Sequence, residues 1–165
     1  MIFATASRDG TVKYWNIDGH ANSINSLAFN VQGTLLATVS ADRTARGWDV
    51  STDIPRQRFL LTGHGDQVYR AAFDSTGKIL ATAGLDKLLI LWDTDTGKEI
   101  RRIQKHVDQL RDVAFSPTGR RMASGGADGK AWLYELPDTD LATADIPAIM
   151  VSHSENHDQI SALAF

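Results

Sequence analysis

The stretch GHGDQVYRAAFDSTGKILATAGLDKLLILWDT, residues 63–94, carries the pattern that decides the fold of this chain. Its apolar segments at 68–73, 79–82 and 88–92 are short, and turn-forming Gly, Asp and Ser residues lie between them. Short apolar or β-branched runs between turn signals predict β-strands. The runs are apolar on both faces, which favours a sheet sandwiched between two neighbours.

Two further segments repeat this stretch in register: GHANSINSLAFNVQGTLLATVSADRTARGWDV at 19–50 and KHVDQLRDVAFSPTGRRMASGGADGKAWLYEL at 105–136. In each, a His precedes a Phe by nine residues, that Phe precedes a Gly by four, and an Asp precedes an aromatic residue by six. The equivalent Asp residues lie 44 and then 42 residues apart. A period of about 40–45 residues is typical of four-stranded propeller blades.

Two partial units flank the three complete ones. FATASRDGTVKYWNI at 3–17 matches the back half of a unit, and DQISALAF at 158–165 matches the front half. We therefore expect the chain to begin in the middle of one unit and to stop in the middle of another.

These repeats resemble the WD-repeat β-propeller family. The resemblance is carried by the Gly-His pairs, the Asp six residues before the Trp, and the Trp48-Asp49 and Trp92-Asp93 dipeptides. It implies an all-β fold of four-stranded antiparallel blades, with about three complete blades and two partial ones. The expected boundaries are a partial blade at 1–18 without an outer strand, blades at 19–62, 63–104 and 105–152, and the first strand of a further or shared blade at 153–165. An acidic surface loop is expected at 137–147 within the third blade.

The resemblance also implies a buried hydrogen-bonded chain in each unit, from indole through hydroxyl and imidazole to carboxylate. Such a chain is physically sound, because buried polar groups need partners and an Asp can hold one His tautomer. The expected members are Thr5, Asp9 and Trp15 in the first partial unit, His20, Thr38, Asp42 and Trp48 in the next, His64, Thr82, Asp86 and Trp92 in the third, and His106, Ser124, Asp128 and Tyr134 in the fourth. Tyr134 stands where a Trp is expected, so that network should be altered.

A hydroxyl, a His and an Asp could also form a hydrolase triad. The set recurs at fixed spacing, whereas an active site is singular, and no G-x-S-x-G motif is present. We therefore expect no enzyme, although a hydrolase that uses a Thr-His-Asp set stays an alternative.

His153 and His157 have an i, i+4 spacing that would need a helix to bind a metal, and their segment shows little helical pattern. We expect a surface loop there, with no metal and no cofactor.

The composition bears on partners and location. Seventeen Lys and Arg residues stand against 20 Asp and Glu, for a net charge of −3, so no basic excess exists to neutralise a nucleic acid backbone. No apolar run approaches the roughly 20 residues that a membrane helix needs, and the N-terminus does not resemble a signal peptide. The chain contains no Cys, which fits a cytoplasmic location.

Three arrangements of the blades stay open. The chain could be a fragment of a longer protein, it could close as a small four-bladed ring with one shared blade, or two copies could close a ring of about eight blades. An open arc leaves apolar blade faces and strand edges uncovered, so something must cover them.

The repeats predict a non-enzymatic scaffold that binds other proteins, with a regulatory part of a larger multidomain protein, for example one fused to a bacterial kinase or protease, as an alternative. In the resembling family, partner contacts cluster on the face of the strand-entry and hairpin loops. The matching residues here are Asn25, Tyr69, Arg111 and Ser161 in the first strands, and Arg8, Ala41, Leu85 and Ala127 before the turn Asp. Tyr69 and Arg111 are the leading candidates, because Tyr and Arg are good interface anchors.

Overall fold

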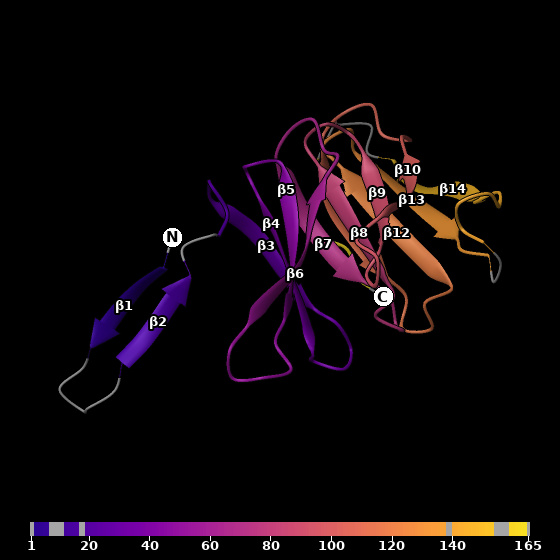
Figure 1. The fold of residues 1–165 in the computed structure, drawn as a ribbon. Coiled ribbons are helices and arrows are strands. Elements are labelled where there is room, and N and C mark those ends of the chain that lie inside the picture. The colour runs from indigo at the N-terminus through magenta and orange to yellow at the C-terminus, as the bar shows by residue number, and fades with distance from the viewer. Residues whose placement is uncertain (1, 7–11, 17–18, 138–139, 154–158, 165) are drawn as a thin grey trace.

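The computed structural model describes residues 2–6, 12–16, 19–137, 140–153 and 159–164. Over these residues the chain consists of β-strands joined by turns and loops, and no helix occurs (Figure 1). The predicted all-β class is therefore confirmed.

Twelve of the strands form three four-stranded antiparallel sheets. The first sheet contains β3 (Ile24–Phe29), β4 (Leu35–Ser40), β5 (Thr44–Asp49) and β6 (Arg56–Thr62). The second contains β7 (Val68–Phe73), β8 (Ile79–Gly84), β9 (Leu89–Asp93) and β10 (Glu99–Ile103). The third contains β11 (Leu110–Phe115), β12 (Arg121–Gly126), β13 (Lys130–Glu135) and β14 (Ala148–His153). β1 (Ile2–Ala6) and β2 (Val12–Asn16) form a separate two-stranded sheet.

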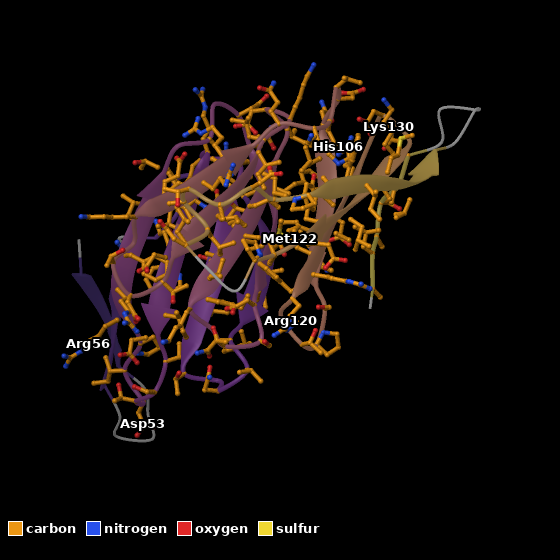
Figure 2. The ribbon with its side chains drawn as sticks, turned by 90° about the vertical axis from the view of Figure 1, so that its right-hand side faces the viewer. Asp53, Arg56, His106, Arg120, Met122 and Lys130 are labelled. Carbon is orange, nitrogen blue, oxygen red and sulfur yellow. The ribbon has the colours of Figure 1, made fainter. Side chains whose placement is uncertain are left out.

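The three large sheets lie side by side as blades, and the described sheets do not close into a ring (Figure 1). β7 contacts both β3 and β11, so the first strands of successive blades are neighbours. The fourth strands, β6, β10 and β14, form the opposite edge of each blade. We call the side of the molecule that carries the repeated His and turn Asp residues of the three blades the His–Asp face. Figure 2 shows His106 and Lys130 on this side of the molecule, Arg120 on the opposite side, and Met122 midway between the two sides.

The second sheet is apolar on both faces because it separates two cores. Leu80 and Ile90 of the second blade pack against the first blade, whereas Ala81 and Leu91, their neighbours in sequence, belong to the core shared with the third blade. Successive side chains of a strand point to opposite faces, so the continuous apolar runs of β8 and β9 serve both cores. All four residues are fully buried.

The first strand of every blade contains a β-bulge at the same place. The register with the second strand shifts between Ile24 and Ser26 in β3, between Val68 and Arg70 in β7, and between Leu110 and Asp112 in β11. The sequence spacing explains this shift, because the apolar residues of β7 follow one another at intervals of three and then two. An extra residue is needed to keep residues three apart on one face of a strand.

The face of the first sheet that points away from the second is open to solvent. Ile24, Leu27 and Phe29 are 56%, 61% and 57% exposed. Their counterparts Val68 and Ala71 in the second blade are 0% and 4% exposed, because they pack against the first blade. The repeat therefore places an interface residue at each of these positions.

Residues 159–164 extend along the third blade but form no strand. The backbone N–H of Ile160 donates to the carbonyl of Gly126 at 3.1 Å, and that of Leu163 donates to the Asp112 carboxylate at 2.6 Å. A strand needs a continuous backbone ladder, which these bonds do not supply. The predicted blade boundaries, including a further blade from residue 153, stay predictions.

Candidate functional site

Four predicted interface residues meet at one hollow on the His–Asp face. Asn25, Tyr69 and Arg111 are the extra residues of the three bulges, and Ser161 is their counterpart in the last segment. All four line a hollow of about 190 Å³, which we call the bulge hollow. A bulge re-aims the side chain of its extra residue away from the regular alternation, and here the bulges turn equivalent side chains toward a common space.

Tyr69 and Arg111 contact each other across the boundary between the second and third blades. The guanidinium carbon of Arg111 lies 5.0 Å from the centre of the Tyr69 ring, a cation–π arrangement. The Nε of Arg111 is buried and has no hydrogen-bond partner among the described residues. Asn25 spans the preceding boundary, since its Nδ2 donates to the carbonyl of Val68 at 2.9 Å.

The structure adds Arg70, Asp112 and Ala162 to the lining of the bulge hollow. The Nε of Arg70 lies 2.8 Å from Oδ1 of Asp112, whose side chain is 3% exposed. Asp112 also accepts the backbone N–H of Val113 at 2.9 Å and that of Leu163 at 2.6 Å. Asp112 thus compensates the charge of Arg70. Sequence reasoning missed this pair, although the opposite charges at equivalent repeat positions were a usable signal.

The second group of predicted interface residues lies beside the bulge hollow but not in its lining. The backbone N–H groups of Ala41, Leu85 and Ala127 donate to carbonyls in the loops that lead into the first strands, at 2.9, 2.9 and 2.8 Å. All three residues are half-buried. Arg8, the fourth member, lies outside the described residues.

The structure brings together the predicted hydrogen-bond networks of the complete blades. In the second blade, Nε1 of Trp92 donates to Oγ1 of Thr82 at 2.8 Å, and that hydroxyl lies 2.8 Å from Nε2 of His64. Nδ1 of His64 lies 2.9 Å from Asp86. In the first blade the equivalent distances are 2.9, 2.8 and 2.9 Å, through Trp48, Thr38, His20 and Asp42.

The direction of donation follows from the carboxylate at one end. Asp86 can only accept, so Nδ1 of His64 carries the proton and Nε2 accepts from the hydroxyl of Thr82. The same hydroxyl oxygen accepts from Trp92, so both of its roles are occupied. The His64 and Asp86 side chains are only 2% and 9% exposed. A hydroxyl that is buried and fully bonded is not available as a nucleophile.

The third blade uses a Tyr in place of the indole. Oη of Tyr134 lies 3.0 Å from Oγ of Ser124, which in turn lies 2.8 Å from Nε2 of His106. Burial raises the pKa of Tyr134 to about 12. Trp132, two residues earlier, has a buried Nε1 without a hydrogen-bond partner among the described residues, and the ammonium of Lys105 lies 5.7 Å from its ring centre.

The turn carboxylates are held in their charged form. Burial raises the pKa of Asp86, but the hydrogen bond from His64 and two backbone N–H donors outweigh that effect, and the pKa lies below its usual value. The pKa of Asp128 is lowered in the same way by its own His. The pKa of Asp42 is also lowered. Burial raises it, but the hydrogen bond from the Thr44 hydroxyl is the largest of the effects that outweigh burial. Each carboxylate thereby ties the loop before a first strand to the hairpin between the second and third strands.

The remaining members of the predicted set fall in the first partial unit. Thr5 pairs with Lys13, and Trp15 pairs with Phe3, in the register of β1 and β2. This register matches that of β8 and β9, in which Leu80 pairs with Trp92. Asp9 lies outside the described residues.

The described residues contain neither a metal-binding cluster nor a membrane-spanning helix. No cluster of three or more His, Asp or Glu side chains is arranged to hold a metal ion. None of the described segments is a helix of the length and apolarity that crossing a membrane requires.

Repeated four-stranded blades that pack face to face, each with a network of an aromatic residue, a hydroxyl, a His and an Asp, define a β-propeller protein. The sequence profile of the WD40 family, described as WD domain, G-beta repeat, matches residues 1–16, 17–49, 55–93 and 97–135. Because these matches cover more than half of the chain, the chain belongs to the WD40 family.

Curated relatives and a solved structure agree with this assignment. The chain is 42% identical over 60 residues to a nuclear distribution protein PAC1 of Tuber melanosporum, a match that covers 32% of this chain and 13% of the relative. It is 40% identical over 58 residues to a nuclear distribution protein nudF 2 of Penicillium rubens, covering 30% and 12%. The solved structure of U3-55K superposes with a TM-score of 0.68 at 20% identity, over 81% of this chain and 38% of that one. The chain thus matches only about an eighth of the length of these curated relatives.

Proposed function

We propose that this chain is a non-enzymatic protein-interaction scaffold whose His–Asp face binds other proteins around the bulge hollow. The observation that carries this proposal is the convergence of Asn25, Tyr69, Arg111 and Ser161, from four successive repeats, on one hollow. Tyr and Arg are enriched among residues that dominate binding energy. Ala41, Leu85, Ala127 and Arg8 belong to the same proposed face, around the hollow.

The role of the networks, which join an aromatic residue, a hydroxyl, a His and an Asp, is proposed to be structural. Their hydroxyls are buried and engaged on both sides, and the set recurs in three blades. Each network ties three segments of its blade together. This arrangement supports rigid presentation of the loops on the His–Asp face, which is the property a scaffold needs.

Site-specific photo-crosslinking tests the proposed face. A photoreactive amino acid replaces Tyr69 in one variant and Arg56 in a matched control, because Arg56 is exposed at the other end of the first blade (Figure 2). Both variants are illuminated in cell extract and the adducts are resolved by mass. We expect discrete protein adducts from position 69 that position 56 does not give. Identical adduct patterns from the two positions would contradict the proposal.

We further propose that a second copy of this chain covers the open face of the first blade. Ile24, Leu27 and Phe29 occupy positions that are buried between blades elsewhere in the stack. The surface that normally covers such positions is the face of another blade, and the third blade of a second copy offers such a face.

Other proteins, rather than nucleic acid, are the proposed partners, since the net charge is −3. A cytoplasmic location is proposed from the lack of Cys.

Light scattering behind a sizing column tests the self-association. We expect a discrete species near twice the 18.0 kDa mass for the unmodified chain. Leu27→Asp should return it to the mass of one chain, because a charge in an apolar interface lacks a partner. Val31→Asp, at an exposed residue in the loop after β3, is the control and should leave the mass unchanged. A monomer that stays monomeric at high concentration would exclude self-association.

A further inference from the structure

We infer that the bulge hollow receives a carboxylate side chain from an acidic segment of a partner protein, and that Arg111 binds it. This inference rests on the proposed function, because it names the chemistry of the partner at the same hollow. It goes further, since it assigns a specific charge and a specific donor to the contact.

The charges around the hollow leave one cation without an ionic partner. Arg70 is paired with Asp112 at 2.8 Å, and Asp112 is further satisfied by two backbone N–H groups. Arg111 shares the hollow, yet its described contact is the neutral ring of Tyr69. The lining therefore carries one net positive charge, at Arg111. A carboxylate that enters the hollow would be attracted to this charge.

The Arg111 side chain is arranged in advance for such a contact. Stacking on the Tyr69 ring at 5.0 Å restrains the guanidinium plane, and the bulge orients the backbone that carries it. Its buried Nε has no acceptor among the described residues. Because this Nε is closed to solvent, a ligand would approach the guanidinium through its terminal nitrogens. A carboxylate that binds a guanidinium with both of its oxygens supplies two acceptors in the matching geometry. Little conformational entropy remains to be lost on binding.

The size of the hollow favours a single side chain. Its volume of about 190 Å³ is smaller than the roughly 300–1,000 Å³ of sites that hold small-molecule ligands. The hydroxyl of Ser161 lines the same hollow and offers a further donor. Asp66 and Asp108 are exposed in the loops before β7 and β11. Carboxylates in these loops would repel an extended polyanion, so a partner with one well-placed Asp or Glu fits better than a nucleic acid.

Nuclear magnetic resonance of the arginine side chains tests this inference on the full chain. The Nε–H signal of Arg111 is assigned by its loss in Arg111→Lys. The chain is then titrated with the capped peptide acetyl-Ala-Leu-Glu-Leu-Ala-amide and, separately, with the same peptide carrying Gln in place of Glu. We expect the Glu peptide to move the Arg111 signal saturably and the Gln peptide to bind at least tenfold more weakly.

Two variants give the matched comparison. Arg111→Gln should weaken the binding of the Glu peptide by roughly tenfold or more, since it removes a charge-assisted hydrogen bond. Arg58 lies on the outer strand β6 and is paired with Asp95. Arg58→Gln should therefore leave the affinity for the Glu peptide within about twofold. The backbone spectrum reports whether each variant is folded. If Arg111→Gln does not fold, the Glu and Gln titrations of the unmodified chain still decide the question.

Three results would overturn the inference. Equal affinities for the Glu and Gln peptides would show that no carboxylate is recognised. Equal movement of the Arg58 and Arg111 signals would show non-specific attraction. Much tighter binding of a phosphoserine peptide would show that the hollow is built for phosphate. If position 69 gives specific protein adducts and the titrations give any of these three results, the proposed face is right and the carboxylate assignment is wrong.

Discussion

Replacing Thr82 by Val should destabilise the fold strongly without changing its shape. The two side chains have nearly the same outline, and Thr82 is fully buried, so the change removes a hydroxyl and creates little cavity. It leaves the indole N–H of Trp92 and Nε2 of His64 without the partner that each now has at 2.8 Å. A buried polar group without a partner costs about 1–3 kcal/mol. We therefore expect a loss of about 2–6 kcal/mol in the free energy of unfolding, which is a large share of the ~5–15 kcal/mol typical of a domain.

Urea unfolding followed by far-ultraviolet circular dichroism measures this loss, through the midpoint at an unchanged m-value. Thr82→Ser keeps the hydroxyl and should cost about 1 kcal/mol, the value of one buried methyl group. Thr62→Val is the matched control, because Thr62 is exposed on the outer strand β6, and it should change stability by less than about 0.5 kcal/mol. The reasoning would be refuted if Thr82→Val were no more destabilising than Thr62→Val. The appearance of any hydrolytic activity that Thr82→Val abolishes at unchanged stability would instead support the triad.

Three further predictions concern the same turns and networks. Since the pKa of Asp86 is lowered in the fold, the stability it contributes is present above its unfolded pKa of about 4 and is lost as the pH falls below that value; melting temperatures between pH 7 and 2.5 should show the loss, and Asp86→Asn should flatten it. Tyr134→Phe should cost about 1–2 kcal/mol in urea unfolding, because the Ser124 hydroxyl loses one of its two partners, and an unchanged midpoint would exclude that role. Lys87 adopts a φ of 70°, where the third blade has a Gly, so Lys87→Gly should raise the free energy of unfolding by up to about 1 kcal/mol; a decrease would show that no strain is relieved.

The strands within each blade could be predicted largely from the sequence. The predicted strand at 68–73 agrees with the structure, whereas the predicted strand at 79–82 continues through Ala83 to Gly84. Ala and Gly are both depleted in strands, but here Gly84 pairs with Val68 and Ala83 pairs with Arg70 on the first strand. The ladder, and not the strand propensity of the two residues, therefore decides where the strand ends.

The bulge was encoded in the sequence but was not recognised there. The apolar residues of β7 are separated by three and then two positions, which a regular strand cannot place on one face. The same spacing recurs in β3 and β11, so one local rule fixes three bulges. The His, hydroxyl and Asp spacings are equally local, because all their partners lie in one blade.

The bulge hollow itself was decided by the tertiary structure. The sequence placed Tyr69 and Arg111 at equivalent positions of two repeats, but not in contact. Their stacking, and the ion pair of Arg70 with Asp112, join residues 42 positions apart and form only when two blades pack together. The periodicity of one repeat fixes which side chains leave its sheet. Which of them meet across a blade boundary depends on the distance and angle between the packed sheets, and no single repeat carries that information.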